Sequence, residues 1–351
     1  MIIDFQEDVL LSNYTTIGLG GKAKYFLECK TVNEINSVLN FSKDNNLKVQ
    51  VISGGSNIIF PDEGFEGLVL KIDLKGIKLI EEDDFVITKV SAGENWDDFV
   101  KIIIAKGLSG IECLSGIPGS VGAAPIQNVG AYGQEVKDTI VSLNAIDRDT
   151  FETVTFDNPE CDFDYRLSRF KTNDKDKYII TEVSFRFKKN NQPEIKYPEL
   201  QKYIEYHFDR SHSDSLLEKL NQIRKSVLAL RKKKSMLIDK DDPNSKSCGS
   251  FFMNPVLNEI EFEKFKSRAG RNDFPFYKTG ENFKIPAAWL VEQAGFTKGY
   301  KKNGVGISEN HSLALINING TSGELLKLAY EIEKKIMEKF GIKLYKEPVI
   351  V

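Results

Sequence analysis

Residues 53–57, Ser-Gly-Gly-Ser-Asn, are the first group in the chain whose types and spacing indicate ligand binding. They directly follow KVQVIS, an alternating apolar run that is typical of a strand. A strand that runs into consecutive small residues can turn several backbone N–H groups toward one point, and such a nest binds anions. Ser53, Ser56 and Asn57 would add side-chain donors. A tight turn between two strands explains the same residues equally well.

A second group covers residues 107–133, GLSGIECLSGIPGSVGAAPIQNVGAYG, which hold seven glycines in 27 residues. This composition does not form one regular element without loss of stability. Backbone that passes close to a flat ligand needs residues without bulk, and glycine supplies them. A surface loop is the alternative, but no charged residue lies between Leu114 and Tyr132, which indicates burial. With residues 53–57, this segment predicts one extended ligand with phosphates at one group and a planar ring at the other.

Two common nucleotide motifs are disfavoured. The letters Gly18-Leu-Gly20-Gly-Lys-Ala23 match the dinucleotide fingerprint GxGxxA, but that motif must follow a strand and open a helix. Here it opens an apolar run that predicts a strand. The chain contains no GxxxxGK[ST], so a P-loop is excluded.

The elements that position these groups follow from hydrophobic periodicity and capping residues. Thr31–Glu34 and Thr321–Glu324 are capping boxes, which predict a helix to about residue 45 and a helix that ends at Gly341. Further helices are expected over 95–106, over 285–296, and in the Lys- and Arg-rich region that ends near 234. Strands are expected at 22–29, 48–53, 67–72, 85–92, 139–147, 178–187, 248–255, 311–318 and 344–351.

The overall composition narrows the class of protein. A chain of 351 residues predicts two or three domains. The net charge of −3 gives no basic excess for nucleic-acid or membrane binding. The N-terminal MIIDFQEDVL lacks the pattern of a signal peptide, and no apolar run predicts a membrane span. The four scattered cysteines are expected to be buried reduced thiols, and the three histidines share no metal-ligand spacing with them. We therefore expect a cytoplasmic protein without a metal site.

Six sequence blocks together resemble one known family. They are SGGSNIIF, GIPGSVGAAPIQNVGAYG, DYRLSRF, CGSFFMNP, IPAAWLVEQAGF and the terminal KEP. In this order they resemble the UDP-N-acetylenolpyruvoylglucosamine reductase family, from about residue 14 to the C-terminus. The stretch QPEIKYPELQKY is similar to the tyrosine-bearing insertion of the longer family type. The resemblance implies reduction of the enolpyruvyl ether of UDP-N-acetylglucosamine-enolpyruvate to UDP-N-acetylmuramate, with FAD and with NADPH as hydride donor, in peptidoglycan precursor synthesis.

The resemblance also implies an α+β fold: a PCMH/vanillyl-alcohol-oxidase-like FAD-binding fold of two subdomains, followed by a C-terminal α+β substrate domain. We expect the first FAD-binding subdomain at 1–76, with the terminal strand 342–351 returning to it. The second is expected at 77–235, with the insertion at 190–215, and the substrate domain at 236–341. Small molecules are the expected partners of a monomer, with no nucleic acid and no membrane.

Three catalytic residues follow from the resemblance. Ser250 is the expected proton donor, Arg166 binds the substrate carboxylate, and Glu347 assists in stabilising or protonating the enol. The chemistry needs such groups, because hydride addition to a vinyl ether conjugated to a carboxylate leaves negative charge on that carboxylate, and the adjacent carbon must then take a proton. In isolation, Arg166 reads as a surface ion-pair partner, Ser250 as a turn residue and Glu347 as a solvated side chain.

The remaining site residues are implied in the same way. The substrate nucleotide is expected to contact Tyr197, Lys234, Asn254, Lys284 and Gln293. Arg231, Lys232 and Lys233 are interpreted only as cations that favour a helix C-terminus, and His311 as structural. The FAD is expected to be non-covalent, because all three histidines follow the expected FAD region. The FAD-binding residues are expected to be Ser53, Gly54, Gly55, Ser56, Asn57, Ile117, Pro118, Gly119, Ser120, Gly122, Ala123, Asn128, Gly130, Ala131 and Tyr132.

Two rival interpretations stay open. Another FAD-linked oxidase or dehydrogenase on the same scaffold would keep both glycine groups but has no need of Arg166, Ser250 and Glu347 together. A non-catalytic nucleotide-binding module would bind no flavin.

Overall fold

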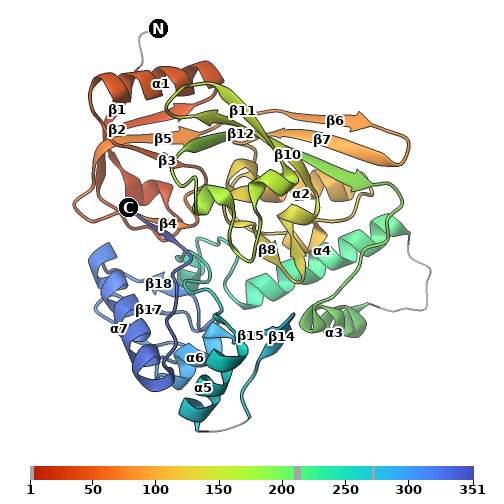
Figure 1. Ribbon diagram of the computed structural model, residues 1–351, viewed down its shortest axis with the longest axis vertical. Coiled ribbons are helices and arrows are strands. Elements are labelled where there is room, and N and C mark those ends of the chain that lie inside the picture. The colour runs from red at the N-terminus through yellow and green to blue at the C-terminus, as the bar shows by residue number, and fades with distance from the viewer. Residues whose placement is uncertain (1–3, 209–214, 271–272) are drawn as a thin grey trace. The chain divides into compact units, whose positions relative to one another are not determined.

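The structure is a computed structural model that describes residues 4–208, 215–270 and 273–351 (Figure 1). These residues form two compact units, each assembled from separate stretches of the chain. Unit 1 comprises the described residues up to Val9 together with those of Ala23–Gly54 and Glu66–Lys232. Unit 2 comprises the described residues of Leu10–Lys22, Gly55–Phe65 and Lys233–Val351. The expected subdomain boundaries stay a prediction.

The larger part of unit 1 is a five-stranded antiparallel sheet that carries helix α2 (Trp96–Ala105) on one face. The buried side of α2 supplies Trp96 and Phe99 to a core that includes Phe185 of the central strand. Asn95 caps the helix by accepting a hydrogen bond from the Asp98 backbone N–H at 3.1 Å. In spatial order the strands are β11 (Thr153–Asp157), β10 (Ile140–Asp147), β12 (Tyr178–Lys188), β7 (Phe85–Ser91) and β6 (Ile77–Glu81).

The other part of unit 1 consists of a four-stranded sheet and helix α1 (Val32–Asp44). Both halves of the expected capping box are present, because the Thr31 hydroxyl accepts from the Glu34 N–H and the Glu34 carboxylate accepts from the Thr31 N–H. Strand β2 begins at Lys22, so the GxGxxA letters lead into a strand, as predicted. The strand order is β1 (Gln6–Leu10), β2 (Lys22–Cys29), β5 (Phe65–Ile72) and β3 (Val49–Ile52).

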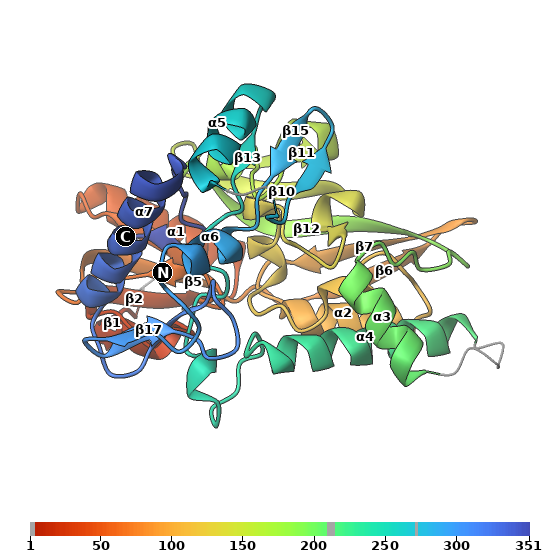
Figure 2. The same cartoon turned by 90° about the horizontal axis from the view of Figure 1, so that it is seen from below.

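Two further helices of unit 1 lie on the same side of the five-stranded sheet as α2 (Figure 2). They are α3 (Pro198–His207) and α4 (Leu216–Lys233). Leu200 of α3 and Val227 of α4 belong to one small buried cluster that also contains Cys113. The last part of the expected insertion, residues 209–214 with His212, lies outside the described residues.

The glycine-rich segment forms no long element, as its composition predicts. It contains short 3-10 turns at Glu112–Leu114, Val121–Ala123 and Pro125–Gln127. These are followed by a hairpin of two-residue strands, β8 (Gly130–Ala131) and β9 (Gln134–Glu135).

Unit 2 is built around helix α7 (Ser322–Phe340), which begins at the expected capping box and ends at Gly341. Its Leu325, Ile332 and Ile336 belong to the largest cluster of buried apolar residues in this unit. The other helices are α5 (Glu259–Ala269) and α6 (Ala287–Gln293). The strands are β4 (Ile58–Ile59), β13 (Val256–Leu257), β14 (Tyr277–Thr279), β15 (Asn282–Lys284), β16 (Lys301–Lys302), β17 (Val305–Ile307), β18 (Leu315–Asn317) and β19 (Val349–Ile350).

The prediction of a regular strand at 248–255 is wrong. This segment makes single antiparallel contacts, such as the bridge between Phe252 and Lys346. Gly249 has a φ of +72°, which breaks an extended strand, and Pro255 has no N–H to continue a ladder. The terminal strand does pair, because β19 lies parallel to β4.

Among the described residues, no helix is long and apolar enough to span a bilayer. Residues 4–208, 215–270 and 273–351 also contain no cluster of metal-binding side chains. The four cysteines are free and buried.

Candidate active site

The start of the first glycine group, Ser53 and Gly54, meets the second group within unit 1. The Ser53 hydroxyl donates a hydrogen bond to the Ser120 hydroxyl. A Cβ at Gly54 would lie only 2.8 Å from the Cα of Gly119, so the two backbones approach more closely than any side chain would permit. Gly119 itself has a φ of +118°, a conformation that L-residues with side chains avoid. The structure therefore brings together Gly54 and Gly119, which are 65 residues apart in the sequence, and explains why both are glycine.

The rest of the first group, Gly55–Asn57, belongs to unit 2. A Cβ at Gly55 would lie 1.8 Å from the Tyr14 carbonyl oxygen, and its φ of +62° also requires glycine. The Asn57 side-chain amide donates to the Glu347 carbonyl oxygen at 3.3 Å. The Val349 N–H donates in turn to the Asn57 carbonyl oxygen at 3.0 Å. Asn57 and Glu347 are thus neighbours in unit 2.

The first residue of α2 and Glu94, just before the helix, hold the middle of the glycine-rich segment. The Trp96 N–H donates to the Gly119 carbonyl oxygen at 3.1 Å, and the Val121 N–H donates to the Glu94 carbonyl oxygen at 2.9 Å. A Cβ at Gly122 would lie 2.4 Å from the Cβ of Ala92, so this position also accepts only glycine. The segment is fixed by backbone contacts that leave little room for movement.

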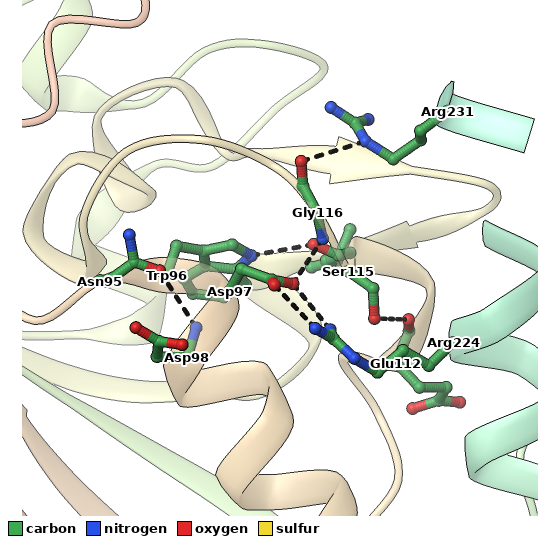
Figure 3. A network of polar contacts seen from close by, with 10 residues as sticks. Asn95, Trp96, Asp97, Asp98, Glu112, Ser115, Gly116, Arg224 and Arg231 are labelled. Carbon is green, nitrogen blue, oxygen red and sulfur yellow. Dashed lines mark hydrogen bonds and ion pairs between the residues drawn. The ribbon is translucent and has the colours of Figure 1, made fainter. Parts of the chain in front are cut away.

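Charged side chains bind the backbone of Gly116, which precedes these residues in the glycine-rich segment (Figure 3). The Gly116 N–H donates to Asp97 Oδ1 at 2.5 Å, and Arg231 Nε donates to the Gly116 carbonyl oxygen at 3.2 Å. Arg224 binds both oxygens of Asp97 at 2.7 Å each. Burial alone would raise the pKa of Asp97, but the hydrogen bonds from Arg224 and Gly116 outweigh it and hold that pKa below its usual value.

Arg166 lies at the tip of a tight hairpin in which Asp164 and Leu167 exchange both backbone hydrogen bonds at 3.1 Å. Its φ is +57°, and its Nη2 donates to the Gly130 carbonyl oxygen at 2.6 Å. The hairpin is tied to the glycine-rich segment, because the buried Ser168 hydroxyl donates to the Ile126 carbonyl oxygen at 2.6 Å. The structure therefore places the expected carboxylate-binding arginine beside the expected FAD-binding residues.

Asn128 and Tyr132 both have left-handed backbone, with φ of +43° and +49°. The Asn128 amide is buried and donates to the Glu135 carboxylate at 3.1 Å and to the Asp164 carbonyl oxygen at 2.9 Å, so both of its hydrogens bind the chain itself. Tyr132 packs edge-to-face on Tyr197 at 5.3 Å between ring centroids. Burial raises the pKa of Tyr132 to about 12, which keeps the phenol neutral at physiological pH.

Ser250 and Glu347 lie on neighbouring antiparallel segments of unit 2. The Glu347 N–H donates to the Phe251 carbonyl oxygen at 2.9 Å, and the Met253 N–H donates to the Tyr345 carbonyl oxygen at 2.9 Å. Phe251 is completely buried, so Ser250 precedes a fixed point of the core. The structure brings these two expected catalytic residues together within one unit, whereas Arg166 belongs to unit 1.

The expected nucleotide-binding residues are distributed over both units. Tyr197 directly precedes α3 in unit 1, and Lys234 directly follows α4 at the start of unit 2. Asn254 fixes the start of α6, because its Oδ1 accepts from the Ala287 N–H at 2.8 Å. Lys284 ends β15, which pairs with β13 and β14, and Gln293 ends α6.

Comparison with known proteins decides the family. The model of an FAD binding domain matches residues 23–155, and that of the C-terminal domain of UDP-N-acetylenolpyruvoylglucosamine reductase matches 241–351. A reductase of that name from Thermobifida fusca is 40% identical, over 100% of this chain and 99% of its own length. One from Streptomyces coelicolor is 41% identical, over 98% of this chain and 90% of its own. The chain belongs to the UDP-N-acetylenolpyruvoylglucosamine reductase family.

The family fold is confirmed as well. The crystal structure of a UDP-N-acetylenolpyruvylglucosamine reductase from Thermus caldophilus matches with a TM-score of 0.65 and 22% identity, over 99% of both chains. The predicted α+β architecture of an FAD-binding region with a C-terminal reductase-family domain is correct.

The local geometry fits the FAD that this family of reductases implies. Gly54 and Gly122 pack directly against the chain, because a Cβ would lie 2.8 Å from the Gly119 Cα and 2.4 Å from the Ala92 Cβ, so this region presents backbone and small side chains. Segment 115–132 contains no charged residue, which suits the apolar faces of a flavin ring. Gly55 has a φ of +62°, the left-handed conformation that occurs in anion-binding backbone nests.

Sequence reasoning missed Asp97 and Arg224, and it interpreted Arg231 only through the helix C-terminus. One signal was available, because Arg224 and Arg231 are seven residues apart and share one face of α4. Their partner Asp97 is 127 residues from Arg224, and no local pattern connects the two.

Proposed function

We propose that this chain reduces UDP-N-acetylglucosamine-enolpyruvate to UDP-N-acetylmuramate, with FAD and with NADPH as the hydride source, in peptidoglycan precursor synthesis. One observation carries this function: relatives named for that reductase match the chain over its whole length at 40% identity, rather than over the FAD domain alone. A general FAD-linked oxidase would share only residues 23–155 with such a family and not the matched C-terminal domain.

When bound, FAD supplies reversible hydride transfer between the nicotinamide and the carbon–carbon double bond. The chain's own residues bind the substrate, orient it and protonate it. Arg166 binds the substrate carboxylate, where charge develops as hydride adds, because its planar fork matches two oxygens. The hairpin that presents Arg166 is held by Asn128 and Ser168, so the guanidinium needs little reorganisation during the reaction.

Ser250 donates the proton to the carbon next to the carboxylate. A serine hydroxyl is a weak acid, so it serves only next to a strongly basic carbanion in a site from which water is excluded. Glu347 stabilises or protonates the enol. Support for this pairing is that both residues lie on adjacent hydrogen-bonded segments of unit 2.

Tyr197, Lys234, Asn254, Lys284 and Gln293 bind the UDP part of the substrate. Lys234 and Lys284 supply positive charge for the diphosphate, and Tyr197 supplies a ring against Tyr132. The longer tyrosine-bearing insertion fits this assignment, since Tyr197 is the N-cap residue of α3.

We further propose a cytoplasmic monomer with non-covalent FAD and the subdomain division 1–76, 77–235 and 236–341. The location is supported by the four free cysteines and by a substrate pair, NADPH and a UDP-sugar, that occurs in the cytoplasm. Non-covalent binding is supported by the position of all three histidines after residue 155, the end of the matched FAD domain.

The test is an anaerobic spectral titration of the purified protein. Oxidised flavin absorbs at about 450 nm, and NADPH should bleach this absorbance. The enolpyruvyl UDP-sugar should then restore the yellow form without oxygen. Bleaching without recovery would contradict the substrate assignment and favour another FAD-linked dehydrogenase. A protein that binds no flavin at all would contradict the flavoenzyme function itself.

A further inference from the structure

Both backbone groups of Gly116 are bound by charged side chains, which come from two different helices (Figure 3). Asp97, in the first turn of α2, accepts from the N–H, and Arg231, in the last turn of α4, donates to the carbonyl oxygen. A glycine peptide in an irregular segment ordinarily binds water or another backbone group. The N–H belongs to the peptide between Ser115 and Gly116 and the carbonyl to the peptide between Gly116 and Ile117, so the two charged partners hold both of the peptides that flank Gly116.

Asp97 is itself fixed by α4. Arg224 Nη1 and Nη2 bind the two carboxylate oxygens at 2.7 Å each, which is the bidentate geometry of the strongest arginine–carboxylate pairs. The side chains of Arg224 and Asp97 are 12% and 30% exposed, so solvent screens this pair less than a fully exposed one. Unlike a surface ion pair, Asp97 also accepts the Gly116 N–H on the same oxygen that Arg224 Nη1 contacts.

Gly116 lies three residues before Gly119, whose backbone meets Gly54. With a φ of +72°, Gly116 turns the chain from the buried Ser115 toward Ile117. A rotation of either peptide that flanks Gly116 would displace residues 117–120, which are expected to face the flavin. The backbone support of Gly119 comes from Trp96, in the same turn of α2 that carries Asp97, and that of Val121 comes from Glu94, just before this helix.

We propose that Asp97 is a positioning residue for cofactor binding. Held by Arg224, it fixes the peptide between Ser115 and Gly116 through the Gly116 N–H, and so holds the following segment 117–120 in the conformation that lies against Gly54 and accepts FAD. This inference rests on the proposed function, because it assumes that the segment binds flavin. It assigns to α2 and α4 a role in cofactor affinity rather than only in stability.

The test compares FAD dissociation constants of apoprotein variants, measured by the quenching of flavin fluorescence. D97N keeps the size of the side chain but loses its charge and the strength of both contacts. We expect its dissociation constant for FAD to rise about tenfold or more, as the loss of a charge-assisted hydrogen bond implies. R224Q should have a similar effect, and the double variant should bind no more than about twofold more weakly than the weaker single variant, because both changes break one unit.

D98N is the matched control, because Asp98 is the next carboxylate in the same helical turn and is exposed. It should bind FAD within about twofold of the wild type. With FAD saturating, the KM of D97N for the UDP-sugar should stay unchanged, since the nucleotide is held by other residues. R224K, which keeps the positive charge of α4 but not the bidentate fork, provides a second arm if D97N does not fold, and it should also weaken FAD binding.

An unchanged FAD dissociation constant in D97N or, should that variant not fold, in R224K would overturn the proposal, and so would a lower melting temperature of the apoprotein with unchanged FAD affinity. A raised KM for the UDP-sugar with normal FAD binding would also overturn it. Failure of the wild-type protein to bind FAD would instead contradict the proposed function, so the two failures are distinguishable.

Discussion

Left-handed backbone marks several of the residues on which the chemistry depends. Asn128, Tyr132 and Arg166 all have positive φ, although none of them is glycine. Such conformations cost roughly 1 kcal/mol or more each and persist only where surrounding contacts enforce them. At Asn128 and Arg166 those contacts are visible as hydrogen bonds to the Asp164 and Gly130 carbonyl oxygens. The backbone is therefore strained where the substrate carboxylate is expected to bind.

Replacing Ser250 with alanine should separate the two half-reactions. The flavin should still be bleached by NADPH, because that step needs no proton from Ser250. Reoxidation by the enolpyruvyl UDP-sugar should slow by about 100-fold to 10,000-fold, the range that a general acid contributes. Anaerobic stopped-flow absorbance measures both steps in one sample. An equal slowing of both half-reactions would show that the variant damages the fold or the flavin site rather than proton donation.

The pH dependence of the Asp97 contacts has a definite sign. Because hydrogen bonds from Arg224 and Gly116 depress the pKa of Asp97, its contribution is present above the ordinary carboxyl pKa of about 4 and is lost as the pH falls through the lower folded-state value. The ratio of FAD dissociation constants between D97N and the wild type should therefore be constant from about pH 6 to 9. Fluorescence titrations at several pH values check this. A ratio that changes across the neutral range would mean that another group titrates.

At the scale of elements, the helices and strands with strong local signals could be predicted from sequence. Helix α1 ends at Asp44, one residue from the expected end, and α7 covers Ser322–Phe340, because capping boxes and terminal glycines act within a few residues. The edge strands β6 and β11 were missed. Each is a five-residue strand that pairs with only one neighbour, so its formation depends on a partner that the local sequence does not reveal.

The contents of the site divide in the same way. Glycine-rich composition predicted where the backbone must be bare; at Gly54 and Gly119 the structure shows that two backbone segments pack against each other, whereas contact with a flat ligand stays a prediction. It did not predict what holds that backbone in place. Asp97, Arg224 and Gly116 meet only after two helices have packed on one sheet, and salt bridges on helices are usually uninformative. Hydrophobic periodicity therefore predicts the helices and strands, whereas the side-chain contacts that hold the site in place depend on tertiary structure.

The close approach of the two glycine groups predicts a specific sensitivity. Gly54 has no left-handed backbone, so G54A imposes no conformational strain, yet its new Cβ would lie 2.8 Å from Gly119. One segment must move, and we expect FAD to bind roughly 10-fold to 100-fold more weakly. G323A is a matched control, because the nearest atom to its Cβ is at an ordinary 3.6 Å. Fluorescence titration with FAD checks both, and equal affinities would show that the two segments are free to separate.

At the scale of the whole molecule, the cysteines report on opening of the fold. Cys29, Cys113, Cys161 and Cys248 are all buried, and they are distributed over both units. Burial raises the pKa of Cys29, Cys161 and Cys248 to about 12 and that of Cys113 still further, so the reactive thiolate is suppressed. Each thiol therefore becomes reactive only when the structure around it opens, and its rate of modification measures how often that happens.

Bound FAD should slow this modification. A ligand that binds only the folded state stabilises it by mass action, so FAD at about 100 times its dissociation constant should reduce the open population about 100-fold. Reaction with an aromatic disulfide reagent, followed by absorbance with and without FAD, measures the effect. In denaturant all four thiols should react at once, which is the control for reagent and protein concentration. Rapid reaction of any native thiol, at a rate that FAD does not change, would show that its surroundings open independently of the cofactor site.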